Sequence, residues 1–179
     1  MPGSAFWLTG LPGSGKSTLA LAAKEAFPEI VLLQMDEMRK IVTPEPTYSD
    51  EERELLYMAL VYAAMVLTRA GNDVIIDATG HLRRWRDKAR GLIAGFHEIY
   101  IKCPIETCIE REKGRHDGLA PVDIYEKAKK GWPVPGINVP YEEPEVPELV
   151  LDCEKVSAGE ADGILLKYLK GAPRASRPA

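Results

Sequence analysis

Residues 5–17 read AFWLTGLPGSGKS, and this stretch decides the fold class. Its first five residues, 5–9, form an apolar run that is typical of a buried strand. The pattern G-x-x-x-x-G-K-S follows from Gly10 to Ser17, and residues 14–27 have the composition of a helix. A glycine-rich loop between a strand and a helix points successive backbone N–H groups at phosphate oxygens, and the helix N-terminus adds partial positive charge. The sequence therefore predicts a P-loop, which binds the phosphates of a nucleotide.

The polar residues of this loop have separate expected roles. Lys16 reaches the β- and γ-phosphates of the nucleotide, so we expect it to be catalytic as well as ATP-binding. The hydroxyl of Ser17 is an expected ligand of Mg²⁺. The loop residues expected to bind ATP are Gly10, Gly13, Ser14, Gly15, Lys16, Ser17 and Thr18.

Strands and helices alternate along the rest of the chain. Further strands are expected at residues 30–33, 73–77, 96–102 and 149–151, and further helices at 50–71, 83–94, after Pro104, and at 158–169. Such alternation predicts an α/β fold of the P-loop NTPase type, a parallel five-stranded sheet with helices on both faces.

Two of the expected helices differ in polarity. Ser49 or Asp50 caps the first, which contains the apolar run LLYMALVYAAMVL at 55–67. We expect that helix to be wholly covered, because a helix that is apolar all round must be buried. The run is too short to cross a membrane, which takes about 20 residues. The helix at 83–94 is rich in charge, so we expect it to be exposed.

The length of the chain, 179 residues, is that of one domain. We expect a single P-loop domain over residues 1–171 and a flexible tail at 172–179. Residues 114–147 are rich in proline and glycine and interrupt the alternation of strands and helices. A long irregular segment inside a domain is usually functional, so we expect a lid over about 112–147.

The composition limits the partners of this chain. Lys and Arg number 23 against 27 Asp and Glu, and an acidic chain of net charge −4 without a basic block is a poor candidate for binding duplex nucleic acid. Three cysteines without a CxxC pair indicate reduced thiols and a cytoplasmic location. The three histidines have no zinc-site spacing. We expect a small-molecule substrate, and neither nucleic acid nor a membrane as partner.

Two carboxylates are candidates for phosphoryl-transfer chemistry. Asp77 ends an apolar strand, where a carboxylate can hold Mg²⁺, although it could instead cap the next helix. Asp36 follows the second strand and could accept the proton of an attacking hydroxyl, although it could instead cap a helix at 37–41. We assign Asp36 as the base and Asp77 as the metal partner, but the residues alone do not distinguish these two roles.

Three segments of the chain resemble those of a known family: FWLTGLPGSGKST at 6–18, YIKCPIETCIER at 100–111, and PGINVPYEEPEVPELVLD at 135–152. On these segments the chain resembles the adenylylsulfate (APS) kinase family over nearly its whole length. The third segment resembles a tail that is specific to that family. The resemblance implies an ATP- and Mg²⁺-dependent kinase that phosphorylates the 3′-hydroxyl of APS, and a homodimer. It also adds Arg111 to the residues expected to bind ATP.

The family's substrate residues are kept in part. Asp36 and Arg39 match its D-x-x-R pattern, Tyr48 matches an aromatic that stacks on adenine, and Arg53 matches its substrate arginine. The resemblance therefore implies that Arg39, Tyr48 and Arg53 bind the acceptor.

Other positions depart from the family. This chain has Gln34 where the family has an aspartate, LYMA at 56–59 where it has N-I-R-R, and TGH at 79–81 where it has I-S-P. It also has Val122 where the family has a lysine and Val134 where the family has a second aromatic residue. We therefore expect a weak wall opposite Tyr48 and a high KM for APS. Residues 77–79, DAT, resemble those of other small-molecule and polynucleotide P-loop kinases. The alternatives are a related kinase with a different hydroxyl or amidate acceptor, and a nucleotide-dependent switch.

Overall fold

The computed structural model describes residues 1–113 and 123–173, and its strands and helices alternate as the sequence predicts. The strands are β1 (Ala5–Thr9), β2 (Val31–Gln34), β3 (Val74–Asp77), β4 (Phe96–Lys102) and β5 (Leu149–Asp152). The helices are α1 (Lys16–Ala26), α2 (Met35–Val42), α3 (Asp50–Arg69), α4 (Arg83–Leu92), α5 (Ile105–Lys113), α6 (Ile124–Ala128) and α7 (Ala158–Gly171). The predicted five-stranded α/β fold is confirmed.

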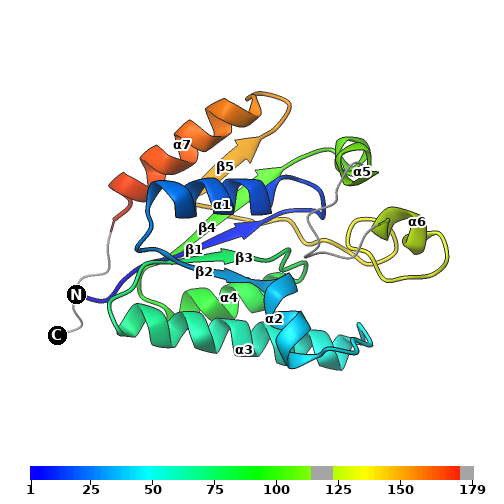
Figure 1. Cartoon of the computed structure of the whole chain (residues 1–179), viewed down its shortest axis with the longest axis horizontal. Coiled ribbons are helices and arrows are strands. Elements are labelled where there is room, and N and C mark those ends of the chain that lie inside the picture. Colours follow the sequence, from blue (N-terminus) through cyan, green and yellow to red (C-terminus); the bar gives the residue numbers. More distant parts are fainter. Residues whose placement is uncertain (114–122, 174–179) are drawn as a thin grey trace.

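The five strands form one parallel sheet in the order β2-β3-β1-β4-β5. Helices α1 and α7 lie on one face of it, and α3 and α4 lie on the other (Figure 1). Because successive strand side chains point to opposite faces, β1 contributes to two cores. Trp7 packs into the core under α3 and α4, whereas Phe6 and Leu8 pack into the core under α1 and α7. This explains why the strand is apolar from Ala5 to Leu8.

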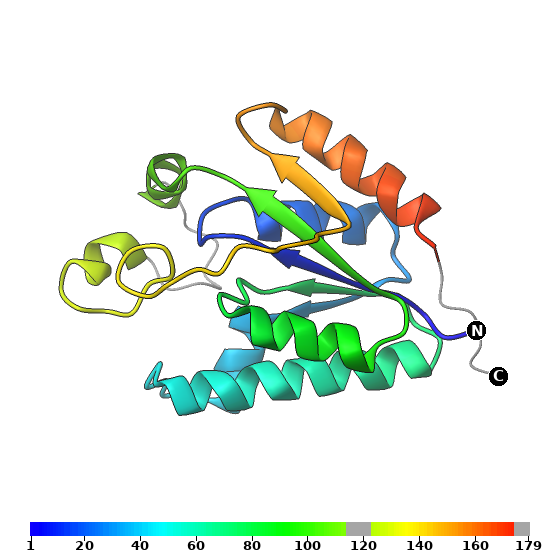
Figure 2. The ribbon, with the colours of Figure 1, turned by 180° about the vertical axis from the view of Figure 1, so that it is seen from behind.

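The carboxyl ends of all five strands meet at one edge of the sheet. Seen from behind, α5 and α6 lie beyond this edge, at the end of the molecule opposite the N-terminus (Figure 2). In parallel α/β sheets this edge is where ligands bind. Part of the expected lid, residues 114–122 with Val122, and residues 174–179 of the expected tail lie outside the described residues. Within the described part of the lid, the sequence did not predict the short helix α6.

The long helix α3 begins where the sequence predicts, because the Ser49 side chain accepts a hydrogen bond from the Glu52 backbone N–H. The prediction that this helix is wholly covered is wrong for the single chain. Leu55, Tyr62 and Val66 are 72%, 65% and 44% exposed, and their spacing puts them on one face. Among the described residues, no helix is long and apolar enough to cross a membrane.

The prediction that the charged helix α4 is exposed is also wrong in part. Trp85, Arg86 and Ala89 are buried, and they form the inner side of the helix. Arg86 is buried because its Nε donates to Glu98 Oε1 of β4 at 2.5 Å. The composition of α4 shows that the helix is charged, but it cannot show that Arg86 is buried, because its ion-pair partner lies on the neighbouring strand β4.

Candidate active site

The P-loop has the backbone geometry that phosphate binding needs. Gly10, Gly13 and Gly15 have φ angles of 154°, 78° and 107°, which side-chain-bearing residues rarely adopt. A Cβ on Gly13 would also lie 2.5 Å from the carbonyl oxygen of Cys108, so glycine is required there. The buried hydroxyl of Ser14 has no hydrogen-bond partner within residues 1–113 and 123–173. An incoming phosphate oxygen can satisfy that hydroxyl.

Contacts within the loop and from the lid hold this cradle in place. Lys16, in the first turn of α1, donates from Nζ to the carbonyl oxygen of Leu11 at 2.8 Å. The hydroxyl of Tyr125, in α6, donates to the carbonyl oxygen of Pro12 at 2.7 Å. The lid helix therefore supports the P-loop directly, and the Lys16 ammonium is held against the loop backbone.

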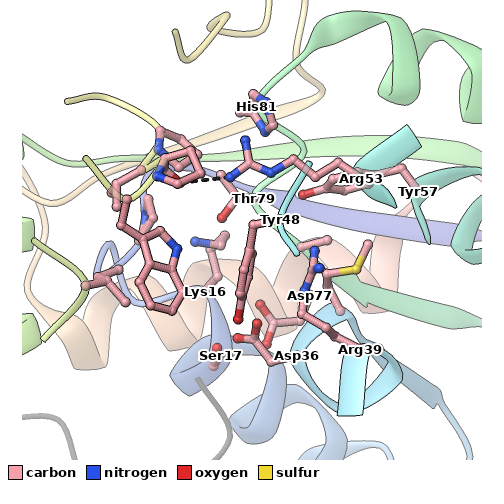
Figure 3. Close-up of a pocket in the computed structure, with 18 residues that line it drawn as sticks. Lys16, Ser17, Asp36, Arg39, Tyr48, Arg53, Tyr57, Asp77, Thr79 and His81 are labelled. Atoms are coloured by element: carbon pink, nitrogen blue, oxygen red, sulfur yellow. Dashed lines mark hydrogen bonds between the residues drawn. The ribbon is translucent and has the colours of Figure 1, made fainter. Parts of the chain in front are cut away.

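A pocket opens beside the P-loop at the ends of β2 and β3 (Figure 3). Its wall comprises Pro12, Lys16, Ser17, Met35, Asp36, Arg39, Tyr48, Arg53, Tyr57, Asp77, Ala78, Thr79, His81, Ile124, Trp132, Pro133, Val134 and Pro135. Ser17, Asp36 and Asp77 lie at one end, and Arg53 and His81 lie at the other (Figure 3). The structure thus brings together every residue predicted to be catalytic, metal-binding or acceptor-binding.

The two carboxylates occupy different structural positions. Asp77 ends β3 and is buried, and Gln34 at the end of β2 donates from Nε2 to its Oδ2 at 3.1 Å. Neither aspartate caps a helix, because the N-cap of α4 is Leu82 and that of α2 is Gln34. The capping alternatives are therefore wrong. An amide at Gln34 also orients Asp77 without placing a second negative charge beside it.

Tyr48 faces an aromatic residue that the sequence analysis missed. Its ring centroid lies 5.0 Å from that of Trp132 in the lid loop, with the rings tilted by 57°. The Arg39 guanidinium lies over the Tyr48 ring, 4.6 Å from the ring centroid, and forms an ion pair with Glu52. Val134 is aliphatic, as expected, but Trp132 places an aromatic ring in the same wall two positions earlier. The sequence feature that could have identified Trp132 as a pocket residue is the presence of a tryptophan within the predicted lid.

The lid loop that carries Trp132 is held by its own hydrogen bonds. Asn138 Oδ1 accepts from the Val134 backbone N–H at 2.7 Å, and its Nδ2 donates to the Trp132 carbonyl oxygen at 2.8 Å. Val134 itself is buried. The asparagine of the family-like tail is therefore a structural residue of the pocket wall.

Arg53 is a buried cation at the far end of the pocket. Its Nη2 donates to the carbonyl oxygen of Pro133 at 2.8 Å. Within the described ranges, it forms no salt bridge with a carboxylate, in contrast to Arg39. Burial lowers the pKa of Arg53 from its ordinary value, but an arginine remains charged at neutral pH. A buried cation facing a pocket favours an anionic ligand there.

The segment that resembles the family-specific tail, residues 135–152, crosses the loop after β3 and is called the strap below. The backbone N–H of Glu142 donates to the carbonyl oxygen of His81 at 2.8 Å, and the Glu142 side chain accepts from the Arg83 backbone N–H at 2.6 Å. Arg86 joins the two segments, since it donates to the carbonyl oxygens of both Gly80 and Glu142. The strap also brings the Tyr141 hydroxyl within 2.9 Å of the Thr9 hydroxyl. The tail therefore fixes the part of the wall that contains His81.

A second hollow lies on the other side of the P-loop. Its lining is Ser14, Gly15, Thr18, Leu19, Ile101, Arg111, Leu151, Cys153, Val156, Ser157, Ala158, Ala161 and Asp162. The Arg111 guanidinium donates from Nη1 to the carbonyl oxygen of Ser14 at 3.2 Å. This largely apolar hollow is contiguous with the P-loop and is suited to the base of a nucleotide whose phosphates lie in the loop.

Comparison with known proteins gives a consistent result for sequence and fold. Residues 2–152 match the family model described as adenylylsulphate kinase. An adenylyl-sulfate kinase of Bacillus velezensis is 36% identical over 178 residues, which cover 94% of this chain and 86% of that protein. A probable adenylyl-sulfate kinase of Pyrococcus abyssi is 32% identical over 176 residues, covering 95% and 97%.

Solved structures agree with the sequence comparison. The Mycobacterium tuberculosis APS kinase CysC, in complex with AMPPNP and APS, superimposes with a TM-score of 0.78 at 28% identity, and the match covers 93% of this chain and 98% of that one. A gluconokinase from Sinorhizobium meliloti gives a TM-score of 0.65 at 21% identity, with 94% and 92% covered, and supports the fold alone.

Proposed function

This chain belongs to the adenylylsulfate kinase family, and on that premise we propose how its residues transfer the γ-phosphoryl group of ATP to the 3′-hydroxyl of adenylylsulfate. The observation that carries the proposal is a single pocket lined by Lys16 and Ser17 of the P-loop, by the carboxylate of Asp36, and by the side chains of Arg39, Tyr48 and Arg53. Phosphoryl transfer requires this proximity, because its catalysis consists mainly of positioning and electrostatic stabilisation.

On the donor side, the P-loop amides and the Lys16 ammonium bind the triphosphate. The buried, unpaired hydroxyl of Ser14 supports this assignment. The adenine of ATP occupies the second hollow, where Arg111 and Thr18 contribute to the wall. Positive groups placed where negative charge develops stabilise the transition state, so Lys16 is the main catalytic cation of this site.

The donor set beside the P-loop fits Mg²⁺. The Ser17 hydroxyl and the Asp77 carboxylate are hard oxygen ligands, and Mg²⁺ typically takes one or two protein ligands together with substrate phosphates and water. When bound, Mg²⁺ neutralises part of the phosphate charge. Gln34 keeps Asp77 turned toward this place through its 3.1 Å hydrogen bond.

On the acceptor side, the adenine of adenylylsulfate lies between Tyr48 and Trp132, and its anionic group reaches Arg53. This placement puts the ribose near Asp36, at the end of the pocket that also contains Ser17 (Figure 3). Asp36 then accepts the proton of the attacking hydroxyl. Asp36 suits this role better than Asp77, whose carboxylate is buried against Gln34.

We further propose a single domain over residues 1–171, a cytoplasmic location and a homodimer. The exposed apolar face of α3, formed by Leu55, Tyr62 and Val66, supports an interface on that helix. None of these three proposals changes the chemistry of the site.

The decisive experiment incubates the protein with Mg·ATP and a panel of hydroxyl acceptors that includes adenylylsulfate, and identifies phosphorylated products by mass. We expect 3′-phosphoadenylylsulfate, and we expect the Asp36→Asn variant to lose most of this activity. Asp87→Asn, a change on the outer side of α4, is the matched control and should behave as wild type. Phosphorylation of a different acceptor, and not of adenylylsulfate, would refute adenylylsulfate as the substrate. ATP hydrolysis that none of the acceptors increases would indicate a nucleotide-dependent switch instead of a kinase.

A further inference from the structure

His81 is a buried polar side chain that the proposed mechanism does not use. It lies in the loop after β3, is 3% exposed, and lines the acceptor pocket. Its ring contacts are aromatic, with centroid distances of 4.8 Å to Trp85 and 6.4 Å to Tyr57, both edge-on. Within residues 1–113 and 123–173, neither ring nitrogen has a hydrogen-bond partner. The fully buried side-chain nitrogen and oxygen atoms without a partner among the described residues are Ser4 Oγ and Ser14 Oγ, so the His81 nitrogens are not sealed off from the pocket and can hydrogen-bond to a ligand in it.

The surroundings of His81 keep its ring uncharged. Burial, together with the smaller effect of the Arg53, Arg86 and Arg84 cations, lowers the pKa of His81 to about 4. A neutral imidazole has one N–H donor and one acceptor nitrogen. At neutral pH, His81 therefore offers a directional hydrogen bond to a ligand without adding to the charge of the site.

The position of His81 relates it to the anionic end of the acceptor. Figure 3 shows its ring beside the Arg53 guanidinium, at the end of the pocket away from Ser17 and Asp36. Arg53 also donates to the Pro133 carbonyl oxygen, so part of its donor capacity is already used. An oxyanion group held at this end needs a second donor, and the His81 ring is the neighbouring candidate.

We propose that His81 is a specificity-determining residue that donates a hydrogen bond to the terminal sulfuryl group of the acceptor, next to Arg53. The inference rests on the proposed function and extends it. It assigns the recognition of the sulfuryl group, as distinct from the nucleoside monophosphate part, to a position where the chain departs from its family. The strap supports this role, because the Glu142 N–H holds the carbonyl oxygen of His81 and Arg86 holds that of the preceding Gly80.

The test compares two ligands that differ only in the sulfuryl group, adenylylsulfate and AMP. Their dissociation constants are measured by calorimetry for the wild-type protein and for His81→Phe, which keeps an aromatic ring against Trp85 and removes both nitrogens. We expect the affinity for adenylylsulfate to fall about 10- to 100-fold, the effect of one hydrogen bond to a charged group, and the affinity for AMP to change less than about threefold. His81→Gln, which keeps an N–H donor, should recover part of the loss.

His97→Leu is the matched control. It removes another buried imidazole, one that stacks on Phe6 and contacts Tyr168 outside the pocket. We expect this variant to lose stability but to keep the wild-type ratio of the two affinities. Melting curves verify the folding of each variant, and His81→Leu replaces His81→Phe if the latter does not fold.

The outcomes separate the two proposals. Wild-type phosphorylation of adenylylsulfate together with an unchanged ratio in His81→Phe would overturn the role of His81 alone. Equal losses for both ligands would also overturn it, because they would indicate a structural role. A wild-type protein that neither binds nor phosphorylates adenylylsulfate would refute the proposed function, and the sulfuryl contact with it.

Discussion

Removal of the Trp132 ring is the most direct test of how the acceptor is held. Trp132 and Tyr48 contact each other, with ring centroids 5.0 Å apart. A base that enters between them needs van der Waals contact of about 3.5 Å with each ring, so the rings must separate by about 2 Å. In the proposed binding mode, a base between the two rings therefore replaces the Tyr48–Trp132 contact.

Two opposing free energies set the size of the effect. Stacking of a base on one aromatic ring contributes about 1–3 kcal/mol, whereas the contact between two aromatic rings is worth about 0.5–1.5 kcal/mol. The Trp132→Ala variant loses the stacking of the base on the tryptophan, but it also has no Tyr48–Trp132 contact to break when the base binds. The midpoints of the two ranges, about 2 and about 1 kcal/mol, differ by about 1 kcal/mol, which predicts an increase of about fivefold in the KM for adenylylsulfate.

The assay is steady-state formation of 3′-phosphoadenylylsulfate at saturating ATP, with the KM for ATP measured in parallel. We expect the KM for ATP to stay within about twofold of wild type, because Trp132 does not line the nucleotide hollow. Trp132→Phe keeps an aromatic face and should remain close to wild type. An unchanged KM for adenylylsulfate in Trp132→Ala, or a loss confined to kcat, would refute the proposal that the base is held between Tyr48 and Trp132.

Four further predictions follow from the same site and fold. Lys16→Ala should lower kcat by about 100-fold or more with unchanged melting, and near wild-type turnover in the folded variant would contradict the P-loop mechanism. Arg53→Ala should raise the KM for adenylylsulfate and leave the KM for ATP unchanged, so a rise in both constants would argue against a purely acceptor-binding role. Arg86→Met should lower the free energy of unfolding by about 3–5 kcal/mol in urea titrations, because it leaves Glu98 buried without its main partner, and a double variant with Glu98→Gln should recover part of this loss. Light scattering at micromolar concentration should give the mass of two chains, and a mass of one chain would exclude the homodimer.

The phosphate-binding half of the site follows from the sequence because it is local. Strand β1, the P-loop and helix α1 are consecutive, so apolar pattern, glycine positions and helix start predict both structure and chemistry. The parallel sheet also follows from the sequence, since repeated strand–helix alternation allows few other arrangements. Arg39, Tyr48 and Arg53 were predicted through resemblance to a family, and the structure places all three in one pocket.

The rest of the site depends on contacts between segments that are distant along the chain. Trp132 meets Tyr48 only because the lid loop returns across the pocket, and Gln34 meets Asp77 because β2 and β3 pair in that register. The burial of Arg86 likewise requires Glu98 on β4, which the composition of its own helix cannot indicate.

The sequence by itself therefore determined the fold class, the P-loop and the expected catalytic groups of this protein, because short-range patterns encode them. Only the tertiary structure decided which ring faces Tyr48, which faces of α3 and α4 are buried, and that a neutral His81 lies beside Arg53. The physical reason is that the burial of a side chain and its hydrogen-bond partners depend on which residues pack against it. Strand register and the path of the lid and strap determine these neighbours.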